Sequence, residues 1–551
     1  MKRRVFLKST VAAATAGGFM RSKTRVGAEP ATASDHSAIA GQASWPSVPM
    51  PKFVMADGPF AANWDSLRKY YTCPEWFRDA KFGIWAHWGP QSQAQAGDWY
   101  TRSMYLQGHP QYEHHLRRYG HPSKHGAKDL MCEWKAEHFD PEDLIGLYKG
   151  AGAKYFAFMV NHHDNFDSWN SKYQPWNSVN IGPKKDLCRM WADAARKHGL
   201  RFGVTFHNTP YRCWNTFMPA WYGCDREGPK AGVPYDGAVV TKADGVGTAW
   251  EGLDPRDLYG PVHQENTPCP EFVQQFLLRV SDLLEKYHPD LLYFDDAVYH
   301  LLDKNESLRL NAVLGMPDLI TQIAAHYYNS SLMWNQGCME AVLNIKHVAA
   351  TPLMEEMLSS AVVNDFEMKD PDRPFTHPWQ TDTSLGSWHY RDNDKYRSAE
   401  HIVHKLIGIV ANNGNMLLGV APKGDGTIDA RQRNIVEEIG AWLNVNSEAI
   451  FATRPWKRAK EGEFRFTRSK TGDVLYAITA VWPVGGKLTI RSLAKGIDPV
   501  ADVRLLGCDE KLTWRQTDRG LTVDLPAEKP CEHAYSFRIG SPGGRSFAGS
   551  S

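Results

Sequence analysis

Residues 76–100 read WFRDAKFGIWAHWGPQSQAQAGDWY and contain the pattern that decides the fold. Within them, the short apolar run at residues 82–86 stops at a His-Trp-Gly-Pro sequence that begins at His87. An apolar run of this length followed by glycine and proline predicts a buried strand that breaks into a loop. Barrel enzymes place their catalytic residues at such strand ends. A histidine among aromatic side chains also suits a sugar, because aromatic faces stack on pyranose C–H groups while imidazole binds hydroxyls.

Strand and helix patterns alternate from this stretch to about residue 442. Further strands are expected at residues 154–161, 201–206, 291–294, 323–328 and 415–420, and helices at residues 141–150, 187–198, 272–287, 402–411 and 428–443. Strands separated by helices predict parallel βαβ units. So many units over this length favour a (β/α)8-like barrel in the α/β class. No GxGxxG or Walker-type loop occurs, which weakens nucleotide-binding alternatives.

The pattern of apolar residues changes after residue 453. Short apolar runs bounded by Gly, Lys and Asp occur at residues 464–466, 475–478, 488–490 and 521–523. This pattern predicts a small antiparallel β-sandwich. The expected organisation is a signal peptide at residues 1–28, a linker at 29–49, a catalytic barrel at 50–453 and a sandwich at 454–551.

The N-terminus has the pattern of an export signal. Arg3 and Arg4 precede Phe-Leu-Lys, and an apolar, alanine-rich run at residues 10–20 follows. The run is too short to span a bilayer. Paired arginines before such a run are typical of twin-arginine signals. The sequence therefore predicts a periplasmic or secreted protein.

Composition narrows the classes of partner. The 551 residues are 42% hydrophobic and 23% charged, as in a soluble globular protein. The net charge of +1 gives no bulk attraction to nucleic acid or to an anionic membrane. The 9 cysteines form no CxxC pair, which argues against a zinc ribbon. Cys508 and Cys531, close together in the C-terminal region, are expected to form a disulfide.

Polar side chains follow four of the predicted strands. His87, the pair His162–His163, His207 and Asp295 each stand directly after one of them. A single histidine is more often structural, but four such strand ends are improbable as core packing, since each polar group needs a buried partner. A carboxylate at a barrel mouth can attack an anomeric carbon, with a second carboxyl as acid and base. No metal site is predicted, because adjacent histidines diverge and neither HxH nor HExxH occurs.

Longer motifs occur in a defined order along the chain. They are WFRDAKFGIWAHWG (76–89), GDWY (97–100), AKYFAFMVNHHDNFDSWNSKY (153–173), GPKKDL (182–187), HPDLLYFDD (288–296), NNGNMLLGVAPKGDGTI (412–428) and WLNVNSEAIFATRPW (442–456). Together they resemble the retaining α-L-fucosidase family of glycoside hydrolases. The resemblance covers about residues 70–456, and a sandwich follows as in that family.

The resemblance implies exo-cleavage of terminal α-L-fucose from oligo- or polysaccharides by double displacement, with a fucosylated glycan as partner and no cofactor. Asp295 matches the nucleophile. Asp98 stands where the family usually has the longer Glu, and the family's sugar-binding Arg after the nucleophile strand is not recognisable. The residues expected to bind substrate are His87, Trp88, Asp98, Trp99, His162, His163 and His207.

The acid/base is harder to place from the sequence. The family's Trp-Glu motif reads Trp379-Gln380 here, and Gln380 cannot donate a proton usefully. Glu367 lies roughly where the family often carries its acid, and is the expected acid/base. Asp382 is the runner-up, with Glu355 and Glu356 behind it.

Two other functions stay open at the level of sequence. An exo-α-L-galactosidase would use the same machinery, because its sugar differs from L-fucose only by a hydroxyl at C6, which pockets discriminate weakly. A catalytically inactive carbohydrate-binding protein would explain Gln380. The sequence does not indicate the oligomeric state.

Overall fold

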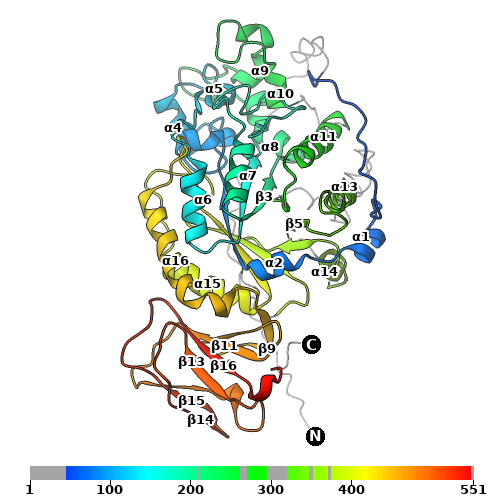
Figure 1. Ribbon diagram of the computed structural model, residues 1–551. Helices are drawn as coiled ribbons and strands as arrows, with labels where there is room; N and C mark the ends of the chain where they lie inside the picture. Colours follow the sequence, from blue (N-terminus) through cyan, green and yellow to red (C-terminus); the bar gives the residue numbers. More distant parts are fainter. Residues whose placement is uncertain are drawn as a thin grey trace, which may run out of the picture. The chain divides into compact units, whose positions relative to one another are not determined.

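The computed structural model describes residues 45–208, 210–260, 270–295, 319–346, 352–369, 371 and 374–547. Eight parallel strands form a closed barrel in chain order (Figure 1). This confirms the predicted barrel. The strands are β1 Phe82–Ala86, β2 Tyr155–Asn161, β3 Arg201–Phe206, β4 Leu291–Phe294, β5 Val342–Lys346, β6 Val363–Asp365, β7 Trp379–Ser384 and β8 Gly414–Gly419. The proposed signal peptide and most of the linker lie outside the described residues.

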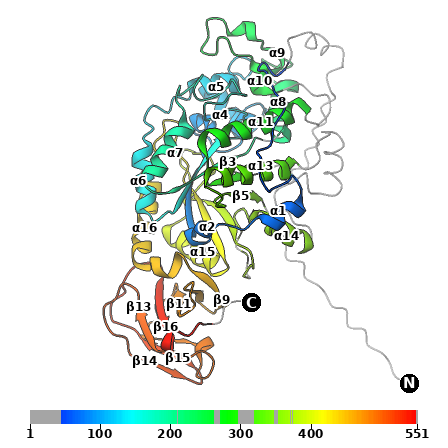
Figure 2. The same ribbon diagram turned by 45° about the vertical axis from the view of Figure 1, so that its right-hand side comes forward.

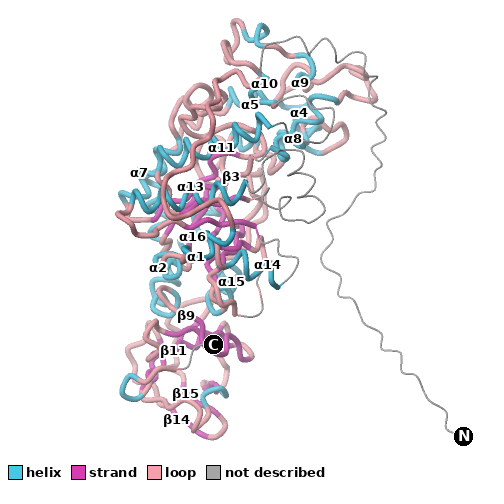
Figure 3. The backbone as a smooth tube through the Cα atoms, turned by 90° about the vertical axis from the view of Figure 1, so that its right-hand side faces the viewer, coloured by secondary structure: helices cyan, strands magenta, loops and turns pink. Residues whose placement is uncertain are grey.

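Helices lie on the outside of the strands, as Figures 2 and 3 show for α7, α11 and α13. Two begin at the expected carboxylates: Asp140 accepts hydrogen bonds from the first turn of α6, and Asp186 from that of α7. The helices are α1 Trp64–Tyr70, α2 Glu75–Ala80, α3 Tyr100–Ser103, α4 Pro110–Arg118, α5 Ala127–Glu133, α6 Pro141–Gly150, α7 Leu187–Lys197, α8 Pro210–Tyr222, α9 Asp236–Val239, α10 Pro255–Tyr259, α11 Pro270–Tyr287, α13 Leu319–Trp334, α14 Pro352–Ser359, α15 Ala399–Ala411 and α16 Ala430–Ile450.

One predicted element is wrong. Residues 323–328, expected as a strand, belong to α13. Most of that helix is buried, so its sequence shows no polar face, and a short apolar run of this kind does not distinguish a strand from a buried helix. Within the described ranges, no helix combines the length and the apolar character needed to cross a membrane.

Large side chains fill the barrel interior. Trp85, Tyr155, Tyr293 and Leu417 belong to one buried cluster, together with Phe77 of α2. The Phe77 ring lies 5.8 Å from that of Tyr155. Since α2 directly precedes β1, this packing closes the end of the barrel where the strands begin. The candidate site lies at the opposite end, where the strands stop.

The C-terminal domain contains two antiparallel sheets. One has the strand order β13-β16-β11-β10-β9 and the other β12-β15-β14, which confirms the predicted antiparallel domain. The strands are β9 Arg454–Glu461, β10 Phe464–Arg468, β11 Val474–Thr479, β12 Lys487–Ile490, β13 Asp502–Leu505, β14 Trp514–Thr517, β15 Gly520–Asp524 and β16 Tyr535–Gly540.

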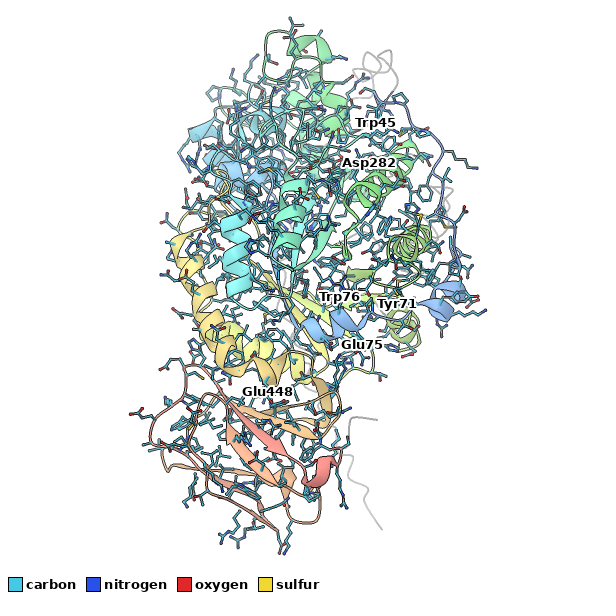
Figure 4. All side chains as sticks on the ribbon, in the orientation of Figure 1. Trp45, Tyr71, Glu75, Trp76, Asp282 and Glu448 are labelled. Carbon is cyan, nitrogen blue, oxygen red and sulfur yellow. The ribbon has the colours of Figure 1, made fainter. Side chains whose placement is uncertain are left out.

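Helix α16 joins the barrel to this domain. Glu448, labelled in Figure 4, accepts a hydrogen bond from Tyr476 at 2.8 Å and pairs with Arg538 at 3.0 Å. The expected disulfide is wrong, because Cys508 and Cys531 are both free thiols. Cys531 Sγ instead donates to the Ala534 carbonyl at 3.3 Å.

Candidate active site

The polar residues predicted at strand ends meet at one end of the barrel. Side chains alternate along a strand, so residues two apart face the same side. An inward residue on each of three strands therefore supports a site residue above it. Trp85 Nε1 donates to Thr205 Oγ1 at 3.2 Å, and that hydroxyl lies 3.1 Å from His207 Nε2. In the three pairs, Trp85 of β1 precedes His87, Thr205 of β3 precedes His207, and Tyr293 of β4 precedes Asp295, each site residue coming directly after its strand.

Asp295 is held as an anion. Its Oδ1 accepts a hydrogen bond from the Tyr293 hydroxyl at 3.0 Å and lies 2.7 Å from Lys346 Nζ, and its Oδ2 lies 3.1 Å from His207 Nδ1. Burial favours the protonated acid, but the interactions with Lys346 and His207 outweigh it and bring the Asp295 pKa well below its usual 3.8. His207 therefore contacts the carboxylate at the end of β4.

Lys346, the last residue of β5, connects two carboxylates. Its Nζ lies 2.7 Å from Asp295 Oδ1 and 2.9 Å from Glu367 Oε2. The two oxygens can be no farther apart than these distances added together, which is close to the ~5–5.5 Å separation of retaining glycosidases. Burial disfavours the ammonium, but Asp295, Asp382 and Glu367 outweigh it and hold the Lys346 pKa well above its usual value.

Two of the expected sugar-binding histidines are neutral imidazoles. Burial, and then the neighbouring histidines, lower the pKa of His87 and of His162 well below 6.5. The His87 and His162 ring centroids are 5.2 Å apart. A neutral ring has one donor and one acceptor nitrogen, so a ring nitrogen without a protein partner can bind a hydroxyl.

Trp99 lies beside these rings. Its centroid is 4.4 Å from that of His163, whose Nδ1 lies 2.8 Å from the His207 carbonyl. The backbone of Trp99 is left-handed, with φ of 61°, which is uncommon for so large a residue. Such strain persists where the surrounding structure holds it in place, and it concentrates at functional sites.

The acidic residue of the GDWY motif pairs with a histidine that the sequence did not single out. His389, in the loop after β7, approaches Asp98 Oδ1 through Nδ1 at 2.7 Å, and the same oxygen lies 3.5 Å from His162 Nε2. Burial opposes ionisation of Asp98, but the His389 hydrogen bond lowers its pKa. His87, His162 and His389 also place one nitrogen each within 4.8 Å of one another, a grouping that the sequence did not predict.

Some predicted residues lie elsewhere. Trp88 is fully buried, donates to the Lys423 carbonyl at 2.7 Å and packs on Trp134 at 5.1 Å between centroids. We therefore leave it out of the sugar-binding group. Glu356 is exposed on α14 and pairs with His377 at 3.1 Å, so the described contacts do not place it at the site.

A second pair of carboxylates lies deeper in the barrel. The Tyr293 hydroxyl is 3.1 Å from Asp382 Oδ2 and 3.4 Å from Asp365 Oδ1. Gln380 Nε2 donates to Asp365 Oδ2 at 2.8 Å. Burial, and then the charge of Asp382, raise the Asp365 pKa well above its usual value, while burial raises the Asp382 pKa to about 6. Asp365 therefore keeps its proton to a higher pH than an ordinary aspartate does.

This buried pair makes stability depend on pH. The pKa of Asp382 in the folded protein, about 6, is above its ordinary 3.8. Protonated Asp382 therefore adds to the free energy of unfolding fully below about pH 4, and this contribution is lost as pH rises through 6. Asp382→Asn removes the charge, and we expect it to gain about 1–3 kcal/mol over the wild type at pH 8. The gain should shrink towards pH 4. Thermal unfolding at both values measures it, and an equal gain at both would contradict this origin.

Sequence reasoning missed Lys346, Tyr293 and His389. The run Val342–Lys346 contains three aliphatic residues, Val342, Leu343 and Ile345, which would have identified β5, with Lys346 at its end. His389 stands five residues after the end of β7, a strand that was not predicted because its residues Trp379–Ser384 are mostly polar. Recognising β7 would have identified His389 as another histidine near a strand end.

Comparison with known proteins gives the family of relatives. The sequence profile described as "Alpha-L-fucosidase" matches residues 50–448, and that described as "Alpha-L-fucosidase C-terminal domain" matches residues 459–540. The tissue α-L-fucosidase of Bos taurus is 26% identical over 524 residues, covering 91% of this chain and 95% of its own. The plasma α-L-fucosidase of Homo sapiens is 24% identical, covering 87% and 92%.

Solved structures agree in fold. The α-fucosidase of Thermotoga maritima in complex with fucose is 26% identical, with a TM-score of 0.63, and covers 87% of this chain and 100% of its own. The same enzyme in complex with a mechanism-based inhibitor gives 26% identity and a TM-score of 0.64, covering 88% and 100%.

Proposed function

This chain belongs to the α-L-fucosidase family, and from that premise we propose that it is an exo-acting retaining glycosidase that releases terminal α-L-fucose from fucosylated glycans. The observation that carries the mechanism is the separation of Asp295 and Glu367 on either side of Lys346. The upper limit set by the two contacts with Lys346 matches direct attack by a carboxylate and is shorter than the ~6.5–9.5 Å that an inverting enzyme needs for an intervening water.

In the first step, Asp295 Oδ attacks the anomeric carbon, and the glycosidic C–O bond breaks. Glu367 gives its proton to the departing oxygen, so the alcohol leaves neutral and a fucosyl ester of Asp295 remains. In the second step, Glu367 takes a proton from water, whose oxygen attacks the same carbon and displaces Asp295 as a carboxylate. Two inversions restore the original α-configuration.

Lys346 suits both steps. Before the first, the anion beside its ammonium is Asp295 and Glu367 carries the proton. In the ester, Asp295 is neutral and Glu367 is the anion. The ammonium therefore contacts the ionised carboxylate in each state, while the charge moves between Asp295 and Glu367.

Exposure supports Glu367 over Asp382 as acid/base. The Glu367 side chain is 43% exposed, whereas Asp382 is 1% exposed beneath Tyr293. The leaving group of an exo-enzyme points into solvent. The general acid must contact the glycosidic oxygen of that leaving group, so an exposed position such as that of Glu367 suits it. The raised pKa of Asp382 would suit an acid, but its position does not suit contact with an aglycone.

Turnover of aryl glycosides tests the function. We expect hydrolysis of p-nitrophenyl α-L-fucoside to exceed that of the α-L-galactoside, with α-L-fucose as the anomer first seen by NMR. The galactoside as the better substrate would keep the mechanism and change the sugar. β-L-fucose as first product would contradict retention, and turnover of neither glycoside would favour a binding protein.

The export signal extends this proposal. Arg3 and Arg4 with the apolar run at residues 10–20 support passage through a twin-arginine route to the periplasm or outside the cell. Arg3→Lys with Arg4→Lys should leave the protein in the cytoplasmic fraction. Unchanged export would contradict this route.

A further inference from the structure

His389 lies inside the ring of sugar-binding histidines. Its side chain is 0% exposed, and its centroid is 4.4 Å from that of His87 and 4.8 Å from that of His162. The neighbouring Trp388 lies 5.8 Å from His87. The loop after β7 thus contributes an imidazole to a group otherwise formed by the ends of β1 and β2.

Asp98 determines which ring nitrogen of His389 is left for a ligand. Nδ1 donates its proton to Asp98 Oδ1 at 2.7 Å, so Nε2 is the ring nitrogen left to meet a ligand. That Nε2 is buried and has no hydrogen-bond partner among the described residues. Burying an unsatisfied polar atom is costly, and a ligand that reaches such an atom removes this cost.

We infer that His389 Nε2 accepts a hydrogen bond from a ring hydroxyl of the bound sugar, with Asp98 as the positioning residue behind it. This rests on the proposed glycosidase function. The carboxylate of Asp98 is already used by His389 and lies near His162. The imidazole therefore lies between the shorter acid and the sugar. Its Nδ1 binds Asp98, and its Nε2 accepts from a hydroxyl of the substrate.

A divalent metal is the competing ligand for the same three histidines. The Gln91 side-chain amide donates to His162 Nδ1 at 2.7 Å, so the proton of this neutral ring lies on Nε2, facing Asp98. With one nitrogen already accepting and the other protonated, His162 has no lone pair left for a metal. The hydrogen bonding therefore favours a hydroxyl.

Deoxy sugars test the inference. The wild type and His389→Ala are compared on p-nitrophenyl α-L-fucoside and its 2-, 3- and 4-deoxy analogues. We expect His389→Ala to lower kcat/KM on the parent about 10²-fold. For one analogue, the wild type should lose a similar factor while the variant loses almost nothing further, because the missing partner is already gone. His389→Gln, which keeps a polar atom near the position of Nε2, should recover part of the loss.

Controls separate the outcomes. His138→Ala, at an exposed histidine, should behave as the wild type on all four substrates. If every hydroxyl deletion costs His389→Ala as much as it costs the wild type, the inference is wrong. A stoichiometric metal in the purified wild type, absent from the variant, would overturn it in favour of a metal site. A wild type inactive on the fucoside would refute the proposed function instead.

Discussion

Asp295→Ala is expected to lower kcat on p-nitrophenyl α-L-fucoside about 10⁴-fold or more, since a residue that forms a covalent bond cannot be replaced by binding alone. The wild-type carboxylate is kept ionised by Lys346 and His207, so it is ready to attack over the whole neutral range. Removing it leaves Lys346 Nζ facing a space that a small anion can occupy.

Azide provides the readout. Added to Asp295→Ala, it should attack the anomeric carbon once, from the face that Asp295 used, and give β-L-fucosyl azide. Glu356→Ala, which removes an exposed carboxylate that pairs with His377, serves as a control and should keep normal activity. Near-normal activity of Asp295→Ala, or azide rescue of Asp382→Asn instead, would show that the nucleophile lies elsewhere.

Glu367→Ala is expected to lower kcat/KM about 10²–10⁴-fold on fucosides with poor leaving groups, such as a fucosyl disaccharide. It should have a much smaller effect on formation of the ester from 2,4-dinitrophenyl α-L-fucoside, because that leaving group departs without a proton. A deficit that grows with leaving-group pKa is specific to an acid. A merely structural role would slow all substrates alike.

The stereochemistry of azide rescue distinguishes the two acid/base candidates. In Glu367→Ala, azide should replace water in the second step and give α-L-fucosyl azide. Asp382→Asn should give no such product, because Asp382 lies beneath Tyr293. The α-azide from Asp382→Asn, with Glu367→Ala unaffected on poor leaving groups, would reverse the assignment.

The strands predicted from sequence were those whose residues are mostly apolar. Strands β2 and β4 are buried along their whole length, and their ends at His162 and Asp295 were visible as breaks in hydrophobicity. Strands β6 and β7 were missed because the inward faces carry Asp365 and Asp382. Polar groups inside a barrel remove the periodicity by which a strand is recognised.

The sequence by itself determined the barrel, the antiparallel domain after it and the four strand ends that carry His87, His162, His207 and Asp295, because these depend on hydrophobic pattern over short distances. Only the tertiary structure decided which charges meet. Lys346, Glu367 and His389 stand 51, 72 and 94 positions after Asp295, and closure of the barrel brings them to one mouth. Ionisation follows contacts of about 3 Å, and such contacts between distant segments are properties of the folded chain.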